Sequence, residues 1–306
     1  MLPLKTTALK IRQSHGESLR TRFAPTPSGY LHAGNAFSFL ITWLIARFSG
    51  GKILLRIDDN DALRAREAYL DDIFESLLWL GLDYDEGAKN TADFRENYSQ
   101  TLRKDYYLSF LKDAHLKKLL FACDCSRKSF SGNYPGTCLL RALDFDTPDT
   151  ALRINTLSAK NIIFEDALKS DIFVNLHEIM PFFILRTKNL LPAYQLVSVI
   201  EDTENSMNFI VRGEDLLPST AAQLFFAGEI AALHNFRNTL FLHHALLKDD
   251  SGNKLSKSEG AFSLRDMRRK HADPKQLFLH FSHLLNFPPL ESASEMLKFL
   301  SEKEIS

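Results

Sequence analysis

The chain has 306 residues, of which 45% are apolar and 25% charged, so it can build a sizeable core and is too hydrophobic for a disordered protein. Its formal net charge of −1 excludes nucleic-acid binding through bulk charge but allows a local basic surface. The longest nearly apolar stretch, residues 36–46, is too short to cross a bilayer. With three cysteines and no apolar run typical of a secretory signal, we expect a cytoplasmic protein that does not associate with membranes.

Two short segments are basic. Residues 1–22 carry five Lys or Arg side chains against one acidic residue, and residues 265–271 carry four against one. A solvated face is the ordinary interpretation of such runs, and contact with phosphate is the alternative for the second segment.

Short aliphatic and β-branched runs alternate with helical stretches, which predicts an α/β fold with a parallel sheet wrapped by helices. In the first half, strands are expected at about 20–24 and 53–57, and helices at about 34–47, 64–80 and 94–119. In the second half, helices are expected at about 193–200 and 219–233, strands at about 209–212 and 239–243, and helices again after residue 257.

Residues 121–190 differ from the segments on either side. They contain all three cysteines, a cluster of Ser, Gly, Asn and Pro at 126–135, and strand signals at 161–164 and 182–185. This composition predicts a subdomain inserted between two halves of a sheet domain. The expected divisions are an N-terminal extension (1–19), the first half (20–120), the insertion (121–190), the second half (191–245) and a helical C-terminal region (246–306).

A phosphate site is predicted where the first strand turns into its helix. No Gly-x-x-x-x-Gly-Lys-Ser/Thr and no Gly-x-Gly-x-x-Gly motif is present, so such a site must be built differently. The segment His32-Ala-Gly-Asn35 opens the helix, where free N–H groups favour phosphate and Gly34 allows a nucleotide to approach the backbone. Further along, Lys254 and Lys257 follow a Gly-containing turn and could clamp a triphosphate.

These two segments resemble the HIGH and KMSKS motifs of class I aminoacyl-tRNA synthetases, the second at four of five positions. The chain resembles the glutamyl branch of this class more closely still, because several further motifs occur in the same order and at the same spacing. These are residues 22–32 (Arg-Phe-Ala-Pro-Thr-Pro-Ser-Gly-Tyr-Leu-His), 56–61, 79–87 and 211–220. The resemblance spans about residues 20–290 and implies a Rossmann-like catalytic domain.

The chain ends about fifty residues after the KMSKS-like loop, where glutamyl-tRNA synthetases continue into an anticodon-binding part. In this it resembles the glutamyl-queuosine tRNA(Asp) synthetases, a truncated paralogous family. The resemblance implies no anticodon-binding domain and a helical stem-contact region at the C-terminus. It further implies that the insertion contacts the tRNA acceptor end and that the protein is a monomer.

The resemblance implies a set of site residues. For L-glutamate these are Arg22, Ala24, Ser28, Asp58, Tyr194 and Arg212; for ATP with Mg²⁺ they are Thr26, His32, Gly34, Asn35 and Lys257; and the catalytic residues are His32, Asn35, Lys254 and Lys257. The charges of the residues assigned to L-glutamate support this assignment independently, because a pocket that matches glutamate needs about two cations and one anion. One position departs from the family, since Asp58 stands where glutamate is usual and reaches one methylene less far.

The cysteines form a candidate zinc site. Cys123 and Cys125 are two residues apart, and Cys138 follows a Gly- and Pro-containing loop, so three thiolates can share one metal if a fourth ligand exists. The paralogous family supplies that ligand from a tyrosine at the position of Tyr134. Three reduced structural thiols without a metal are the alternative.

The resemblance implies a ligase that forms glutamyl-adenylate and passes glutamate to queuosine in the anticodon of tRNA(Asp). Two alternatives stay open. One is a shortened glutamyl-tRNA synthetase that charges the 3′ end of tRNA(Glu). The other is a catalytically silent module that keeps the fold and binds RNA or a protein.

Overall fold

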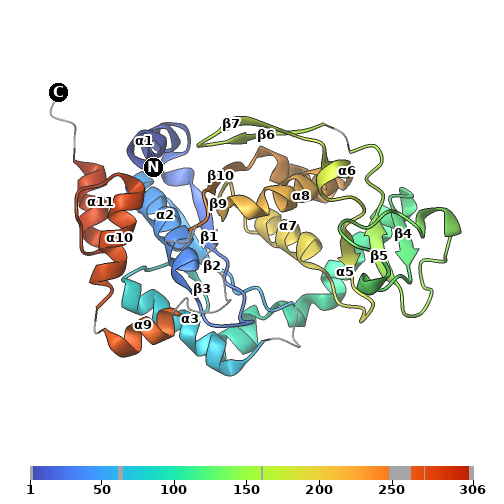
Figure 1. Cartoon of the computed structure of the whole chain (residues 1–306), viewed down its shortest axis with the longest axis horizontal. Helices are drawn as coiled ribbons and strands as arrows, with labels where there is room; N and C mark the ends of the chain where they lie inside the picture. Colours follow the sequence, from blue (N-terminus) through green and yellow to red (C-terminus); the bar gives the residue numbers. More distant parts are fainter. Residues whose placement is uncertain (1–2, 61–64, 160, 248–262, 272, 303–306) are drawn as a thin grey trace.

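Parallel strands form the centre of the molecule (Figure 1). The computed structural model describes residues 3–60, 65–159, 161–247, 263–271 and 273–302. One group of strands pairs in the order β1-β2-β3 and the other in the order β7-β6-β10-β9, with only β7 antiparallel to its neighbour. Their bounds are β1 (Arg20–Phe23), β2 (Lys52–Leu55), β3 (Glu86–Gly87), β6 (Ile162–Asp166), β7 (Ser170–Val174), β9 (Phe209–Gly213) and β10 (Leu240–His244).

The two groups of strands meet at β1 and β9. The backbone N–H of Asn208 donates to the carbonyl oxygen of Arg20 at 3.1 Å, and the N–H of Arg20 donates to Oδ1 of Asn208 at 2.8 Å. The carboxyl ends of β1 and β9 therefore lie side by side, at the edge where open α/β sheets bind ligands. The predicted α/β class is confirmed.

Helix α2 (Ala33–Ser49) is the central core helix, with 12 of its 17 residues buried. A helix that is apolar on nearly all sides needs cover on each of them. Helices α1 (Leu4–Ser14) and α11 (Ala293–Ser301) pack on it, and α10 (Lys275–Leu285) adds Phe281 against Phe37. Helix α1 was not predicted, yet its buried Leu4, Ala8 and Ile11 make residues 4–11 part of the core.

The prediction of one continuous helix at 94–119 is wrong. Residues 94–98 form a π turn, Ser99 is extended, residues 100–103 form a 3₁₀ turn, and α5 begins only at Lys104. The cause is Asp59, which accepts hydrogen bonds from the Ser99 hydroxyl at 2.5 Å and from the N–H of Gln100 at 2.7 Å. The remaining helices are α3 (Glu67–Leu80), α4 (Thr91–Asp93), α5 (Lys104–Leu116), α6 (Leu176–Ile179), α7 (Tyr194–Glu204), α8 (Leu217–Glu229) and α9 (Leu264–Lys270).

The segment 121–190 is divided between two places. Strands β4 (Leu120–Cys123), β5 (Ala151–Ile154) and β8 (Ile184–Arg186) form an antiparallel sheet at the end of the molecule opposite α10 and α11 (Figure 1). The hairpin β6–β7 instead joins the central strands, because β6 pairs with β10. The division of the chain into domains stays a prediction.

The basic residues at 265–271 are not simply a solvated face. Arg268 on α9 bonds to Asp72 at 3.1 Å and to the Ser76 hydroxyl at 2.7 Å, which ties α9 to α3. None of the helices that the structure describes has both the length and the apolarity that a bilayer crossing requires.

Candidate functional site

A cavity of about 450 Å³ lies at the adjoining carboxyl ends of β1 and β9. Its walls come from β1 and the loop after it, the first turns of α2, the N-terminus of α7, and β9. Nine predicted residues line it: Arg22, Ala24, Thr26, Ser28, His32, Asn35, Asp58, Tyr194 and Arg212. Gly34 is not among its lining residues, and Lys254 and Lys257 lie outside the described residues.

His32 is the N-cap of α2. Its Nδ1 accepts a hydrogen bond from the N–H of Gly34 at 3.1 Å, and its own N–H donates to Oδ1 of Asn35 at 3.1 Å, so the two side chains cap the helix reciprocally. A Cβ added at Gly34 would lie 3.0 Å from Cε1 of His32. Gly34 therefore makes room for the His32 ring, and its expected contact with a nucleotide stays a prediction.

The residues on either side of 248–262 adjoin the start of α2. Ser263 forms a β-bridge with His32, and the N–H of Leu264 donates to the carbonyl oxygen of Leu31 at 2.7 Å. On the other side, Nε2 of His244 lies 2.6 Å from the Ser38 hydroxyl. The described residues that flank the segment containing Lys254 and Lys257 thus lie next to the cavity.

A buried cluster of charges around Asp202 of α7, which is 0% exposed, supports the cavity floor. Arg22, Asp58 and Arg212 of this cluster line the cavity, whereas Asp202 and Arg56 do not. The Asp202 carboxylate contacts three guanidinium groups: Arg22 at 2.9 Å, Arg56 at 2.7 Å and Arg212 at 3.6 Å. Burial opposes ionisation of Asp202, but the three guanidinium charges outweigh it and lower its pKa. Asp202 therefore stays ionised and allows the three cations to be buried.

Both oxygens of Asp58 are already engaged. Oδ1 accepts from Nε of Arg56 at 2.7 Å and from Nε2 of Gln100 at 2.8 Å, while Oδ2 lies 3.1 Å from Nη2 of Arg56. Asp58 nevertheless lines the cavity. A ligand ammonium would therefore share this carboxylate with Arg56.

Asp202 and Arg56 were missed as site residues. Arg56 stands in a quoted motif but received no role, although it lies two residues before Asp58 and so can share a face of extended backbone with it. Asp202 and Ser198, whose hydroxyl lies 3.3 Å from Nη2 of Arg56, are four residues apart on α7. That spacing places both on one helix face, but it does not tell which acidic residue of α7 is buried.

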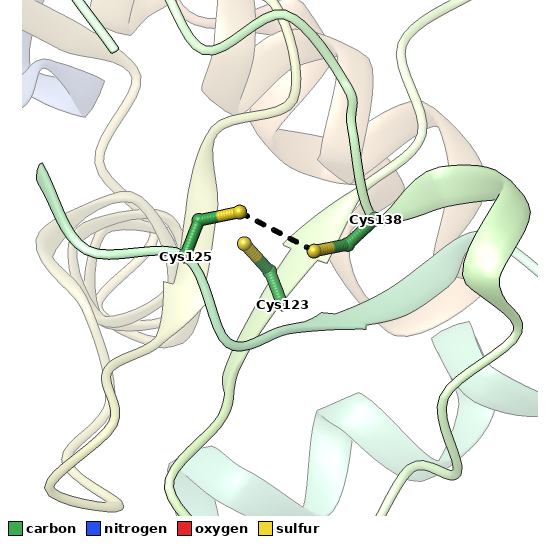
Figure 2. Close-up of side chains that lie close together, drawn as sticks. All are labelled: Cys123, Cys125 and Cys138. Carbon is green, nitrogen blue, oxygen red and sulfur yellow. Dashed lines mark hydrogen bonds between the residues drawn. The ribbon is translucent and has the colours of Figure 1, made fainter. Parts of the chain in front are cut away.

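The three cysteines converge, as Figure 2 shows. Their sulfur atoms all lie within 4.8 Å of one another, and Cys125 and Cys138 are 3.5 Å apart. Tetrahedral zinc with bonds of about 2.3 Å places its sulfur ligands about 3.8 Å apart, which these positions fit. The Tyr134 hydroxyl lies 3.9 Å from Sγ of Cys125 and accepts from the N–H of Cys138 at 2.8 Å, so it is within reach as a fourth ligand.

The environment of Cys123 favours a thiolate. Burial opposes its ionisation, but hydrogen bonds from Tyr134 and Arg153 outweigh it and lower the pKa of this thiol. Burial and the contact with Cys138 instead raise the pKa of Cys125, so a metal that binds its deprotonated form would have to displace that proton. Three cysteine sulfur atoms suit a soft metal ion.

The family model described as "tRNA synthetases class I (E and Q), catalytic domain" matches residues 18–306. The glutamyl-Q tRNA(Asp) synthetase of Prochlorococcus marinus is 32% identical over 305 residues, covering 94% of this chain and 90% of that protein. Glutamate–tRNA ligase 2 of Syntrophus aciditrophicus is 32% identical over 283 residues, covering 87% of this chain and 57% of the ligase.

Solved structures support the fold. The crystal structure of glutamate-tRNA synthetase from Elizabethkingia anophelis superposes with a TM-score of 0.74 at 21% identity, covering 94% of this chain and 66% of that one. The chain spans a little over half the length of several curated ligases that it matches.

Proposed function

The chain belongs to the class I tRNA synthetases (E and Q), and on this premise we propose that it is an ATP-dependent ligase for L-glutamate. A carboxylate oxygen of glutamate attacks the α-phosphorus of ATP, pyrophosphate leaves, and glutamyl-adenylate forms. A tRNA hydroxyl then attacks the activated carbonyl, loses its proton and displaces AMP. No protein nucleophile is needed, so the residues act by positioning and by charge.

The charge of the cavity floor carries the amino-acid assignment. Three guanidinium groups and the carboxylates of Asp58 and Asp202 leave one net positive charge in a buried cluster. Glutamate brings two carboxylates and one ammonium, a net charge of −1, which matches this cluster. Arg22 and Arg212 would receive the carboxylates and Asp58 the ammonium, with Ala24, Ser28 and Tyr194 around them.

ATP would bind at the start of α2. The first N–H groups of a helix of 17 residues and its dipole favour phosphate, and the proposed contacts are Thr26, His32 and Asn35. Gly34, which also makes room for the His32 ring, would let the nucleotide approach the backbone closely. Lys254 and Lys257 would hold the departing pyrophosphate, and Mg²⁺ would accompany the nucleotide.

ATP–pyrophosphate exchange tests the first step. Exchange should depend on L-glutamate and not occur with L-glutamine, whose neutral amide cannot replace the second carboxylate. Arg212→Gln should lose this activity, whereas Arg237→Gln, on an exposed turn, should keep it. Absence of glutamate-dependent exchange in the parent protein would contradict the ligase and favour a silent binding module.

We also propose queuosine in the anticodon of tRNA(Asp) as the acceptor. The relative named glutamyl-Q tRNA(Asp) synthetase, of which the chain covers 90%, supports this choice. The glutamate–tRNA ligases among the relatives favour the 3′ end of tRNA(Glu) as the alternative. Acid-gel analysis of tRNA(Asp) with and without queuosine, beside tRNA(Glu), separates the two, because only the first requires the modified base.

Zinc is the proposed occupant of the cysteine cluster, held by Cys123, Cys125 and Cys138 with Tyr134 as fourth ligand. It would tie the end of β4 to the loop that carries Tyr134 and thereby order a surface for the tRNA acceptor end. The protein is proposed to act as a monomer, which light scattering at the assay concentration tests.

A further inference from the structure

A chain of buried hydrogen bonds runs from Arg212 into the protein. Nη1 of Arg212 donates to the Thr220 hydroxyl at 2.9 Å, the hydroxyl oxygen lies 2.9 Å from Nε2 of His243, and Nδ1 of His243 lies 2.7 Å from Oδ2 of Asp166. The four residues come from β9, α8, β10 and β6 and are 3%, 0%, 0% and 2% exposed. The chain of hydrogen bonds thus joins one cavity residue, Arg212, to α8, β10 and β6.

In this chain of hydrogen bonds, the donor and the acceptor of each bond can be assigned. Burial, above all, lowers the pKa of His243, so its ring is neutral and carries one hydrogen. Asp166 offers only acceptor oxygens, because hydrogen bonds from His243 and from the backbone outweigh the effect of burial and lower its pKa. The hydrogen therefore sits on Nδ1 of His243, which leaves Nε2 as an acceptor. At 2.9 Å, Nε2 is a nearer partner for the hydroxyl proton of Thr220 than the carbonyl oxygen of Leu216 at 3.3 Å.

The Thr220 oxygen then has only lone pairs left for Arg212. It accepts the Nη1 hydrogen, and the Arg212 guanidinium also lies over the Phe241 ring at 5.6 Å. Nε and Nη2 of Arg212 have no hydrogen-bond partner among the described residues, and Oδ2 of Asp202 is 3.6 Å from Nη2. These two atoms form the edge of a guanidinium that holds a carboxylate with two parallel hydrogen bonds.

We propose that Thr220, His243 and Asp166 are positioning residues that turn the Nε and Nη2 edge of Arg212 toward a carboxylate of the amino-acid substrate. This proposal rests on the proposed function. Without the hydroxyl of Thr220, Nη1 of Arg212 loses its partner and the guanidinium can rotate. The loss falls on amino-acid binding and leaves ATP binding unchanged, because the chain of hydrogen bonds ends at Arg212.

Substitution at Thr220 tests the proposal, because valine has nearly the same shape. In ATP–pyrophosphate exchange, Thr220→Val should raise the KM for glutamate about tenfold, the effect of one hydrogen bond to a charged group, and change the KM for ATP less than twofold. Thr220→Ser keeps the hydroxyl and should restore the parent KM. The matched control is Thr239→Val, which removes a buried hydroxyl bonded only to a carbonyl, that of Met207 at 3.1 Å.

The outcomes distinguish a failure of the positioning role from a failure of the proposed ligase activity. If the parent exchanges with glutamate but Thr220→Val matches it, the positioning role is wrong and the ligase stands. Equal increases in both KM values, or in Thr239→Val as well, would show a general structural effect and also overturn it. If no amino acid supports exchange, ¹⁵N NMR of the His243 ring still decides, because hydrogen on Nε2 in the parent contradicts the direction of the chain.

Discussion

Replacing Asp202 by asparagine removes one negative charge from the cluster that supports the cavity floor and almost no volume. The three guanidinium groups around it, at 2.7, 2.9 and 3.6 Å, would then lose the carboxylate that contacts all three of them, while Asp58 still pairs with Arg56. At an effective dielectric constant of about 20, each pair near 4 Å is worth about 4 kcal/mol before the cost of burial. The net cost of breaking a buried ion pair in this way is about 3–5 kcal/mol.

Glu204→Gln is the matched control, because it makes the same chemical change on the same helix. Glu204 pairs with Arg103 near the surface, where such a pair contributes about 0–1 kcal/mol. Urea unfolding at pH 7.5, followed by intrinsic fluorescence, gives the free energy of unfolding for both variants and the parent.

A loss below about 1 kcal/mol in Asp202→Asn, or a loss equal to that of Glu204→Gln, would contradict this role of Asp202. It would mean that the buried guanidinium groups are stabilised by something other than this carboxylate. The cluster would then not have the net charge that matches glutamate, because that net charge includes an ionised Asp202.

The convergence of the cavity residues could be predicted, because carboxyl ends of adjacent parallel strands meet at one edge. Arg22 and Arg212 stand near the ends of two predicted strands, and His32 at the start of a predicted helix, so their proximity follows from the topology. The cysteine cluster could be predicted for a simpler reason, because its residues are close in the sequence.

Asp202 could not be identified in this way. It stands in an acidic run, Glu201-Asp-Thr-Glu204, which in a helix ordinarily faces solvent. Only the packing of α7 shows that Asp202 pairs with Arg22 and Arg212, that Glu201 is buried too, and that Glu204 is exposed. Local pattern predicts the helix, whereas Arg22, a partner of Asp202, lies 180 residues away in the sequence.

The break at Ser99 has the same origin. Residues 94–119 look continuous as a helix, but Asp59, forty residues earlier, captures the Ser99 hydroxyl and the N–H of Gln100. A side chain that offers backbone groups an alternative partner ends a helix where propensity alone would continue it.

Three further measurements test other parts of the molecule. Cys125→Ser should reduce zinc after dialysis from about one ion per chain to a small fraction of that, because three thiolates hold it; equal zinc content would contradict the site. Lys257→Ala should slow exchange about 10²-fold, as expected for one lost preorganised charge, while Lys298→Ala on α11 should not. Burial is the largest cause that lowers the pKa of His244 from its ordinary 6.5, so the folded protein keeps this ring neutral while the unfolded chain binds a proton below that pH. The free energy of unfolding must then fall as the solution is acidified through 6.5, by at most about 1.4 kcal/mol per pH unit for this group. Between pH 7.5 and 5.5 the parent should therefore lose more stability than His244→Gln in urea unfolding, by up to about 1.4 kcal/mol. Parallel pH dependences would show that the pKa of this ring is not lowered in the fold.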